Sequence, residues 1–115
     1  MEIEEMLKRL VSSLDGIKSL VVSSREGLLI SSAGSEVDAP SLCALGAKLI
    51  SGSKWVGKRL DLKDFELTTV EFKDCTVLAY GYGSVSIMAI LERGSNIHLI
   101  KLLLKSSAEE IESLI

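Results

Sequence analysis

The chain has 115 residues and a mass of 12.4 kDa, so we expect a single domain over residues 1–115. Hydrophobic residues make up 47% of the sequence and charged residues 25%, a balance that excludes a disordered or low-complexity chain. The net charge of −3 and the 4% of aromatic residues argue against nucleic acid as a partner, which needs a basic surface or stacking aromatic rings.

The first third of the chain predicts a helix followed by a β-hairpin. Apolar side chains recur at helical spacing over residues 2–14. Residues 17–24 are rich in β-branched and apolar side chains, so they predict a strand. A short turn containing glycine leads into a returning strand at residues 28–32, and we expect a loop over residues 33–37.

A second helix is predicted over about residues 39–57, with Asp38 as its N-cap and Pro40 in its first turn. One stripe along this helix, the leucine stripe, consists of Leu42, Leu45, Leu49 and Val56. A second, the small-residue stripe, consists of Cys43, Gly46, Ala47, Ile50, Ser53 and Gly57. Gly46 and Gly52 each cost about 1 kcal/mol relative to alanine inside a helix. We therefore expect another helix to approach the small-residue stripe closely.

The remaining sequence predicts a β-meander and a last helix. Residues 65–72, 75–82 and 85–92 form three strands joined by two-residue turns. The third of these is apolar on both faces, so we expect it at the centre of a sheet that is covered on both sides. A continuous helical stripe follows over residues 97–115. The order α-β-β-α-β-β-β-α predicts an α+β fold, an α/β/α sandwich around a five-stranded antiparallel sheet.

No stretch of the sequence predicts a membrane span or an export signal. The longest apolar runs, such as residues 87–91, fall far short of the roughly 18 residues of a transmembrane helix. The acidic start lacks the apolar stretch of a signal peptide, so we expect a cytoplasmic protein. Cys43 and Cys75 lack C-x-x-C spacing and are expected to be buried thiols, with a disulfide as the alternative.

The motifs that resemble catalytic or cofactor sites do not have the context that such sites need. Residues 52–59 resemble the phosphate-binding loop G-x-x-x-x-G-K-[ST], but Arg59 replaces the hydroxyl residue. The segment also lies at the C-terminal end of a helix, where the dipole repels phosphate. Gly81 and Gly83 belong to a hairpin turn, and His98 is the only histidine. We expect no enzyme activity, no metal and no other cofactor.

Trp55, the only tryptophan, has two interpretations. It covers the end of its helix as a partly buried cap, or it anchors an interface, where Trp and Arg are enriched. Neighbouring cations favour the second interpretation. The candidate partner-binding residues are Lys54, Trp55, Lys58 and Arg59.

The chain as a whole resembles the Roadblock family, which includes dynein light chains of the Roadblock type. The resemblance is carried by Leu14-Asp15-Gly16-Ile17 before the first strand and by the hairpin residues Arg25-Glu26-Gly27-Leu28. It continues in Ala44-Leu45-Gly46-Ala47 and in the passage from the strand at 85–91 through Gly94-Ser95-Asn96-Ile97 into the last helix. None of these segments is a catalytic signature.

The resemblance implies a profilin-like sandwich, with the first and last helices on one face of the sheet and the middle helix on the other. It also implies a dimer of the chain with itself or with a sister Roadblock chain. In such a dimer the two middle helices lie antiparallel, and the third strands pair edge to edge. The candidate dimer-interface residues are Cys43, Gly46, Ala47, Ile50, Ser53, Gly57, Leu67 and Thr69.

Members of this family are non-catalytic regulators or scaffolds. The resemblance therefore implies binding to a Ras-like small GTPase, in an adaptor or GTPase-activating role. Two alternatives stay open: a light-chain or scaffold subunit of a larger complex without a GTPase, and a sensor whose sandwich encloses a small molecule. No arginine finger is evident in the sequence.

Overall fold

The computed structural model describes residues 2–35 and 38–115, and its helices and strands follow the predicted order α-β-β-α-β-β-β-α. The elements are α1 (Ile3–Ser13), β1 (Ile17–Ser24), β2 (Leu29–Gly34), α2 (Ala39–Arg59), β3 (Thr68–Glu71), β4 (Cys75–Tyr82), β5 (Val85–Glu92) and α3 (Ile97–Ser113). Among the described residues, no helix combines the length and the apolar character that crossing a bilayer requires.

The strands form one antiparallel sheet in the order β2-β1-β5-β4-β3. β5 lies at its centre, where Ala89 is the register partner of both Leu20 on β1 and Leu78 on β4. The prediction of a central last strand is therefore confirmed. β2 and β3 are the two edge strands, and β3 pairs with β4 alone.

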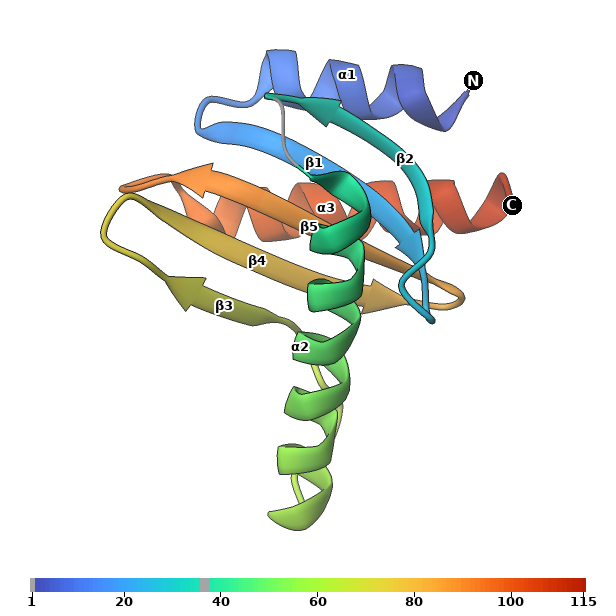
Figure 1. The fold of residues 1–115 in the computed structure, drawn as a ribbon, viewed down its shortest axis with the longest axis vertical. Helices are drawn as coiled ribbons and strands as arrows, with labels where there is room; N and C mark the ends of the chain where they lie inside the picture. Colours follow the sequence, from blue (N-terminus) through green and yellow to red (C-terminus); the bar gives the residue numbers. More distant parts are fainter. Residues whose placement is uncertain (1, 36–37) are drawn as a thin grey trace.

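The sheet separates two apolar clusters, which confirms the predicted sandwich (Figure 1). The larger cluster lies under α1 and α3 and includes the fully buried side chains of Leu7, Ile87 and Leu104. The smaller cluster lies under α2 and includes Cys43 and Met88. Each large side chain buried here contributes about 1.5–3 kcal/mol to folding.

α2 begins as predicted and ends two residues later than predicted. The Asp38 carboxylate accepts hydrogen bonds from the amide and the hydroxyl of Ser41, at 3.2 and 2.6 Å, and Pro40 lies in the first turn. At the other end, the Leu62 amide donates to the Gly57 carbonyl at 2.8 Å, after a left-handed residue, Asp61 with φ 56°. These contacts turn the chain back along the helix.

β2 extends further than predicted. The expected strand at 28–32 and loop from residue 33 were wrong at Ala33 and Gly34, which pair with Leu20 and Ser19 of β1. The backbone pairing continues because the Ser35 amide donates to the Lys18 carbonyl at 2.8 Å. Residues 36–37 of the predicted loop lie outside the described residues.

β3 is shorter than the predicted strand at 65–72, because residues 65–67 cross the sheet edge instead of pairing with β4. Phe65 packs on the α2 side and Leu67 on the α1 and α3 side. The carboxylate of Glu66 between them accepts a hydrogen bond from Lys105 Nζ of α3 at 2.5 Å. This segment therefore contacts helices on both faces of the sheet.

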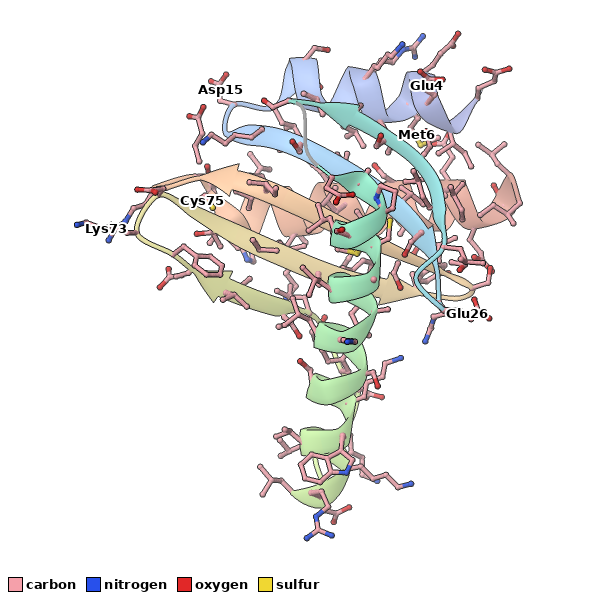
Figure 2. The ribbon with its side chains drawn as sticks, viewed as in Figure 1. Glu4, Met6, Asp15, Glu26, Lys73 and Cys75 are labelled. Carbon is pink, nitrogen blue, oxygen red and sulfur yellow. The ribbon has the colours of Figure 1, made fainter. Side chains whose placement is uncertain are left out.

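The cysteines differ in burial, and neither forms a disulfide. Cys43 is fully buried, as predicted, but Cys75 is only half-buried because it starts β4 beside the exposed β3–β4 turn. Figure 2 labels Cys75 and Lys73 at this end of the sheet.

Candidate interaction surface

Only part of the leucine stripe faces outward on α2, because Leu42 and Leu49 are half-buried against the smaller core cluster. Leu45 is 58% exposed and Val56 is 46% exposed. Cys43, Gly46 and Ile50 of the small-residue stripe are buried against the sheet of their own chain. The prediction that these three residues face a second helix was therefore wrong.

Gly46 and Gly52 show which side of α2 faces the sheet. A Cβ on Gly46 would overlap the side chain of Met88, which is fully buried on β5. Gly46 thus lets α2 approach its own sheet closely, with Met88 filling the space between them. A Cβ on Gly52 would have nothing within 4 Å, because Gly52 lies on the exposed side of the helix.

Three other members of the small-residue stripe are half-buried in contacts within the chain. The Cβ of Ala47 is 3.3 Å from the position of a Cβ on Gly27 in the β1–β2 turn. Gly57 faces Leu62 in the returning chain. The Ser53 hydroxyl donates to the Leu49 carbonyl at 2.7 Å and shares a hydrogen bond with the Thr68 hydroxyl.

The two predicted interface residues near β3 differ in exposure. Leu67 is half-buried in the larger core cluster, so it belongs to the interior of the chain. Thr69 is exposed on β3, whose outer edge has no partner strand among residues 2–35 and 38–115. Phe72, directly after β3, is also exposed. Thr69 is the residue of the predicted interface that lies fully on the surface.

Beyond Ser53, α2 extends past β3 and away from the sheet (Figure 1). We call residues 54–59 the overhang. The chain returns along it over residues 60–65, and a groove of about 620 Å³ lies between the two segments. Large apolar side chains stay exposed here, including Leu60 and Leu62. Figure 2 shows the side chains of the overhang pointing into solvent on several sides.

All four predicted partner-binding residues lie on the overhang. Trp55 is 62% exposed, so the interpretation as a partly buried cap was wrong. The Arg59 guanidinium lies 5.7 Å from the centroid of the Trp55 ring, a cation–π contact at the tip of the helix. Lys54 and Lys58 line the groove, and Lys54 Nζ lies 5.9 Å from the centroid of the Phe65 ring.

The candidate interaction surface therefore combines the exposed part of the leucine stripe (Leu45 and Val56), the overhang and the outer edge of β3. Sequence reasoning missed Leu45, Gly52, Val56, Leu60 and Leu62 as members of it. One signal in the sequence could have identified them: the leucine stripe is sustained to the end of a helix that is too long to lie on one small sheet.

The described residues offer little for covalent chemistry. Residues 2–35 and 38–115 contain no group of three His, Cys, Asp or Glu side chains that could hold a metal ion. Burial raises the pKa of the Cys43 thiol above its usual value, and a hydrogen bond with Ser23 offsets part of that rise. A buried, protonated thiol is a poor nucleophile. His98 is exposed on α3.

Comparison with known proteins agrees with this architecture. The family model described as the Roadblock/LC7 domain matches residues 3–92. A Roadblock/LC7 domain from Streptomyces avermitilis is similar in structure, with a TM-score of 0.90 and 19% sequence identity over 99% of this chain and 98% of that chain. MglB of Myxococcus xanthus has a TM-score of 0.84 and 23% identity over 97% and 93% of the two chains.

A profilin is a more distant structural neighbour. Profilin IB of Acanthamoeba castellanii has a TM-score of 0.66 and 8% identity over 96% of each chain. At such identities the likeness concerns the fold alone. The predicted profilin-like arrangement of sheet and helices is confirmed.

Proposed function

Because the chain belongs to the Roadblock/LC7 family, we propose that it is a non-catalytic dimeric regulator or scaffold that binds a Ras-like small GTPase. The observation that carries this proposal is the unpaired apolar surface of α2 and β3. A single copy of the chain leaves Leu45 and Val56 of the leucine stripe, the rest of the overhang and one sheet edge exposed to solvent. Exposed apolar patches of this kind mark protein–protein contacts.

Dimerisation accounts for the overhang. Two copies that pair their β3 edges form one continuous sheet. The overhang of each copy then extends over the sheet of the other copy. The two α2 helices then run antiparallel over the joined sheets, with the exposed parts of their leucine stripes facing each other. Gly52 lies on that side of the helix, and its missing side chain lets the two backbones come close.

The proposed interface differs from the one predicted from the sequence. Cys43, Gly46 and Ile50 stay in the core of each copy, and the exposed part of the leucine stripe replaces them. Thr69 remains in the interface as part of the β3 edge. An unpaired edge strand is a liability that edge-to-edge pairing removes.

The GTPase is proposed from the family resemblance and from the chemistry of the overhang. Trp55 stacked on Arg59, with Lys54 and Lys58 beside them, combines an exposed aromatic ring with cations. Interfaces concentrate binding energy in such residues. No arginine finger is evident in the sequence. Any effect on GTP hydrolysis would therefore come from positioning the switch loops of the GTPase.

Light scattering after gel filtration tests the dimer. We expect a mass of twice 12.4 kDa for the natural chain. Val56→Arg places a charge in the leucine stripe, so we expect the mass of one chain and the melting temperature that the natural chain has at low concentration. Leu102→Arg is the matched control, because Leu102 is comparably exposed on a helix of the opposite face. A Val56→Arg protein that stays dimeric would place the interface elsewhere.

Binding to small GTPases loaded with GDP or a GTP analogue tests the partner. We expect one nucleotide state to be preferred, and Trp55→Ala to weaken that binding about tenfold or more. Lys48→Ala, on the same helix but outside the overhang, is the control. Stable binding only to other components of a larger complex, with no GTPase, would favour the light-chain or scaffold alternative.

A further inference from the structure

A second, smaller hollow lies on the α2 side of the sheet, between α2, the β1–β2 turn and the start of β5. It has a volume of about 220 Å³ and is lined by Arg25, Ala47, Ile50, Ser51, Lys54 and Ser86. Lys54 is shared with the larger groove, but the other five residues are not. The hollow is therefore a separate feature of the surface.

Two cations share this hollow without a carboxylate. Neither Arg25 nor Lys54 forms an ion pair with any residue in the described part of the chain, and no acidic residue belongs to the lining. Burial lowers the pKa of Lys54 below its usual value, and the positive charge of Arg25 lowers it further. Two like charges held this close in a hollow favour an anion between them.

Two hydroxyl groups complete a set of hydrogen-bond donors. Ser86 is only 1% exposed and lines the inner wall of the hollow. Ser51 supplies a second hydroxyl from the next turn of α2 before Lys54. Both can donate into the hollow, because the hydrogen of a hydroxyl group rotates to suit its acceptor.

A glycine lies beside the hollow. Gly81 is the register partner of Ser86 on the neighbouring strand. A Cβ at this position would lie 4.0 Å from Arg25 Cζ and 3.6 Å from Ile50 Cγ2. Both distances are ordinary van der Waals contacts, so this strand packs directly against the wall of the hollow that Ile50 and Arg25 form.

We propose that this hollow binds one phosphate group, free or as a phosphomonoester. The Arg25 guanidinium donates two parallel hydrogen bonds to two phosphate oxygens, and the Lys54 ammonium contacts a third oxygen. The hydroxyls of Ser51 and Ser86 donate to the remaining acceptor positions. Two cations and two neutral donors match a dianion with several oxygens better than they match a carboxylate, which carries one charge.

Titration of the ¹⁵N-labelled chain with inorganic phosphate, at constant ionic strength in chloride, tests the proposal. We expect saturable shifts of the amides of Arg25, Ser51 and Ser86, together with a higher pKa of the Lys54 ammonium when phosphate is bound. Arg25→Gln should raise the Kd at least about tenfold, since it removes a charge-assisted pair of hydrogen bonds. Arg25 is exposed in a turn, so this variant keeps the fold.

Lys48→Gln is the matched control, because it removes one positive charge from α2 outside the hollow. Equal weakening by Lys48→Gln and Arg25→Gln, or shifts that never saturate, would overturn the proposal in favour of unspecific attraction. Phenyl phosphate in place of inorganic phosphate distinguishes the sources: equal binding assigns the site to phosphomonoesters, and binding of inorganic phosphate alone assigns it to the free ion. Acetate that binds as tightly as phosphate would contradict the proposal.

Discussion

At the scale of single residues, Gly46 and Gly52 can be compared directly, because both lie in α2 but Gly46 is buried against the sheet and Gly52 is exposed. Gly46→Ala would force a methyl group into the buried side chain of Met88, so we expect a net loss of about 1 kcal/mol in unfolding free energy. Gly52→Ala meets nothing within 4 Å and should add about 0.5–1 kcal/mol through helix propensity. Urea unfolding at low protein concentration measures both. Equal effects of the two changes would mean that Met88 moves aside freely.

Asp61 is a second residue at which the backbone conformation determines how a substitution changes the stability. It adopts a left-handed conformation, φ 56°, directly after α2, a position where glycine carries no steric cost. We expect Asp61→Gly to raise the unfolding free energy by about 0.5–1 kcal/mol. Asp74→Gly in the β3–β4 turn is the control, because Asp74 is exposed and does not have a positive φ. Thermal unfolding of the two variants, side by side, tests the difference.

At the scale of elements, residues 65–67 attach the β3 edge to α3 through charge. The hydrogen bond from Lys105, with smaller contributions from the charges of Lys101 and Lys105, holds the pKa of the Glu66 carboxyl below its usual value. A carboxyl with a lowered pKa in the folded state stabilises the fold above its ordinary pKa. That contribution is lost as the pH falls through the lowered value, so we expect stability to decline below about pH 4.

The variant Glu66→Gln should flatten this decline, as measured by urea unfolding between neutral pH and pH 3. Part of the slope should remain, because the hydrogen bonds from Ser41 also lower the pKa of Asp38. Glu71→Gln, on β3 and without an ion pair within the described residues, is the matched control. An unchanged slope in Glu66→Gln would show that the contact with Lys105 does not form in solution.

The sequence predicted the existence of every element, but not the orientation of α2. Its N-cap and its helical pattern are local, so Asp38 and Pro40 sufficed to place its start. The inward side depends on Met88, which reaches the helix from a distant strand and fills the space left by Gly46. Periodicity contains no information about such a contact.

The start of β3 could not be predicted from the sequence for a similar reason. Residues 65–67 have the composition of a strand, and nothing local prevents them from pairing with β4. They leave the sheet because Glu66 binds Lys105 on one face while Phe65 packs under α2 on the other. The side chains that these residues contact lie on α3 and under α2. The sequence therefore predicted that β3 exists, but it predicted the wrong first residue.

At the scale of the whole molecule, the sequence predicted where part of the candidate interaction surface lies, but it did not predict all of the residues that form it. The candidate residues of the overhang, from Lys54 to Arg59, are exposed as a partner-binding surface requires. Three of the predicted dimer residues, Cys43, Gly46 and Ile50, lie in the core of their own chain, because the side of α2 that faces the sheet could not be predicted. Thr69 was placed at an unpaired edge because its position depends only on strand order.

If the exposed surface is covered by a second copy, stability must depend on concentration. Association stabilises the folded state by mass action, so we expect the melting temperature to rise by several degrees over a hundredfold increase in protein concentration. Val56→Arg should remove the dependence and keep the low-concentration value. A melting temperature of the natural chain that does not vary with concentration would argue against a folded dimer.

The central position of β5 also has a consequence for how the chain reaches this structure. β4 and β5 are joined by a two-residue turn, so their pairing is local and forms within microseconds. β1 must find the other side of β5 across a segment of roughly sixty residues, and long-range pairings of this kind are slow. Until β1 pairs with it, one edge of β5, the most apolar strand, can pair with a neighbouring chain. Refolding yield should therefore fall with protein concentration even where the native protein is fully stable.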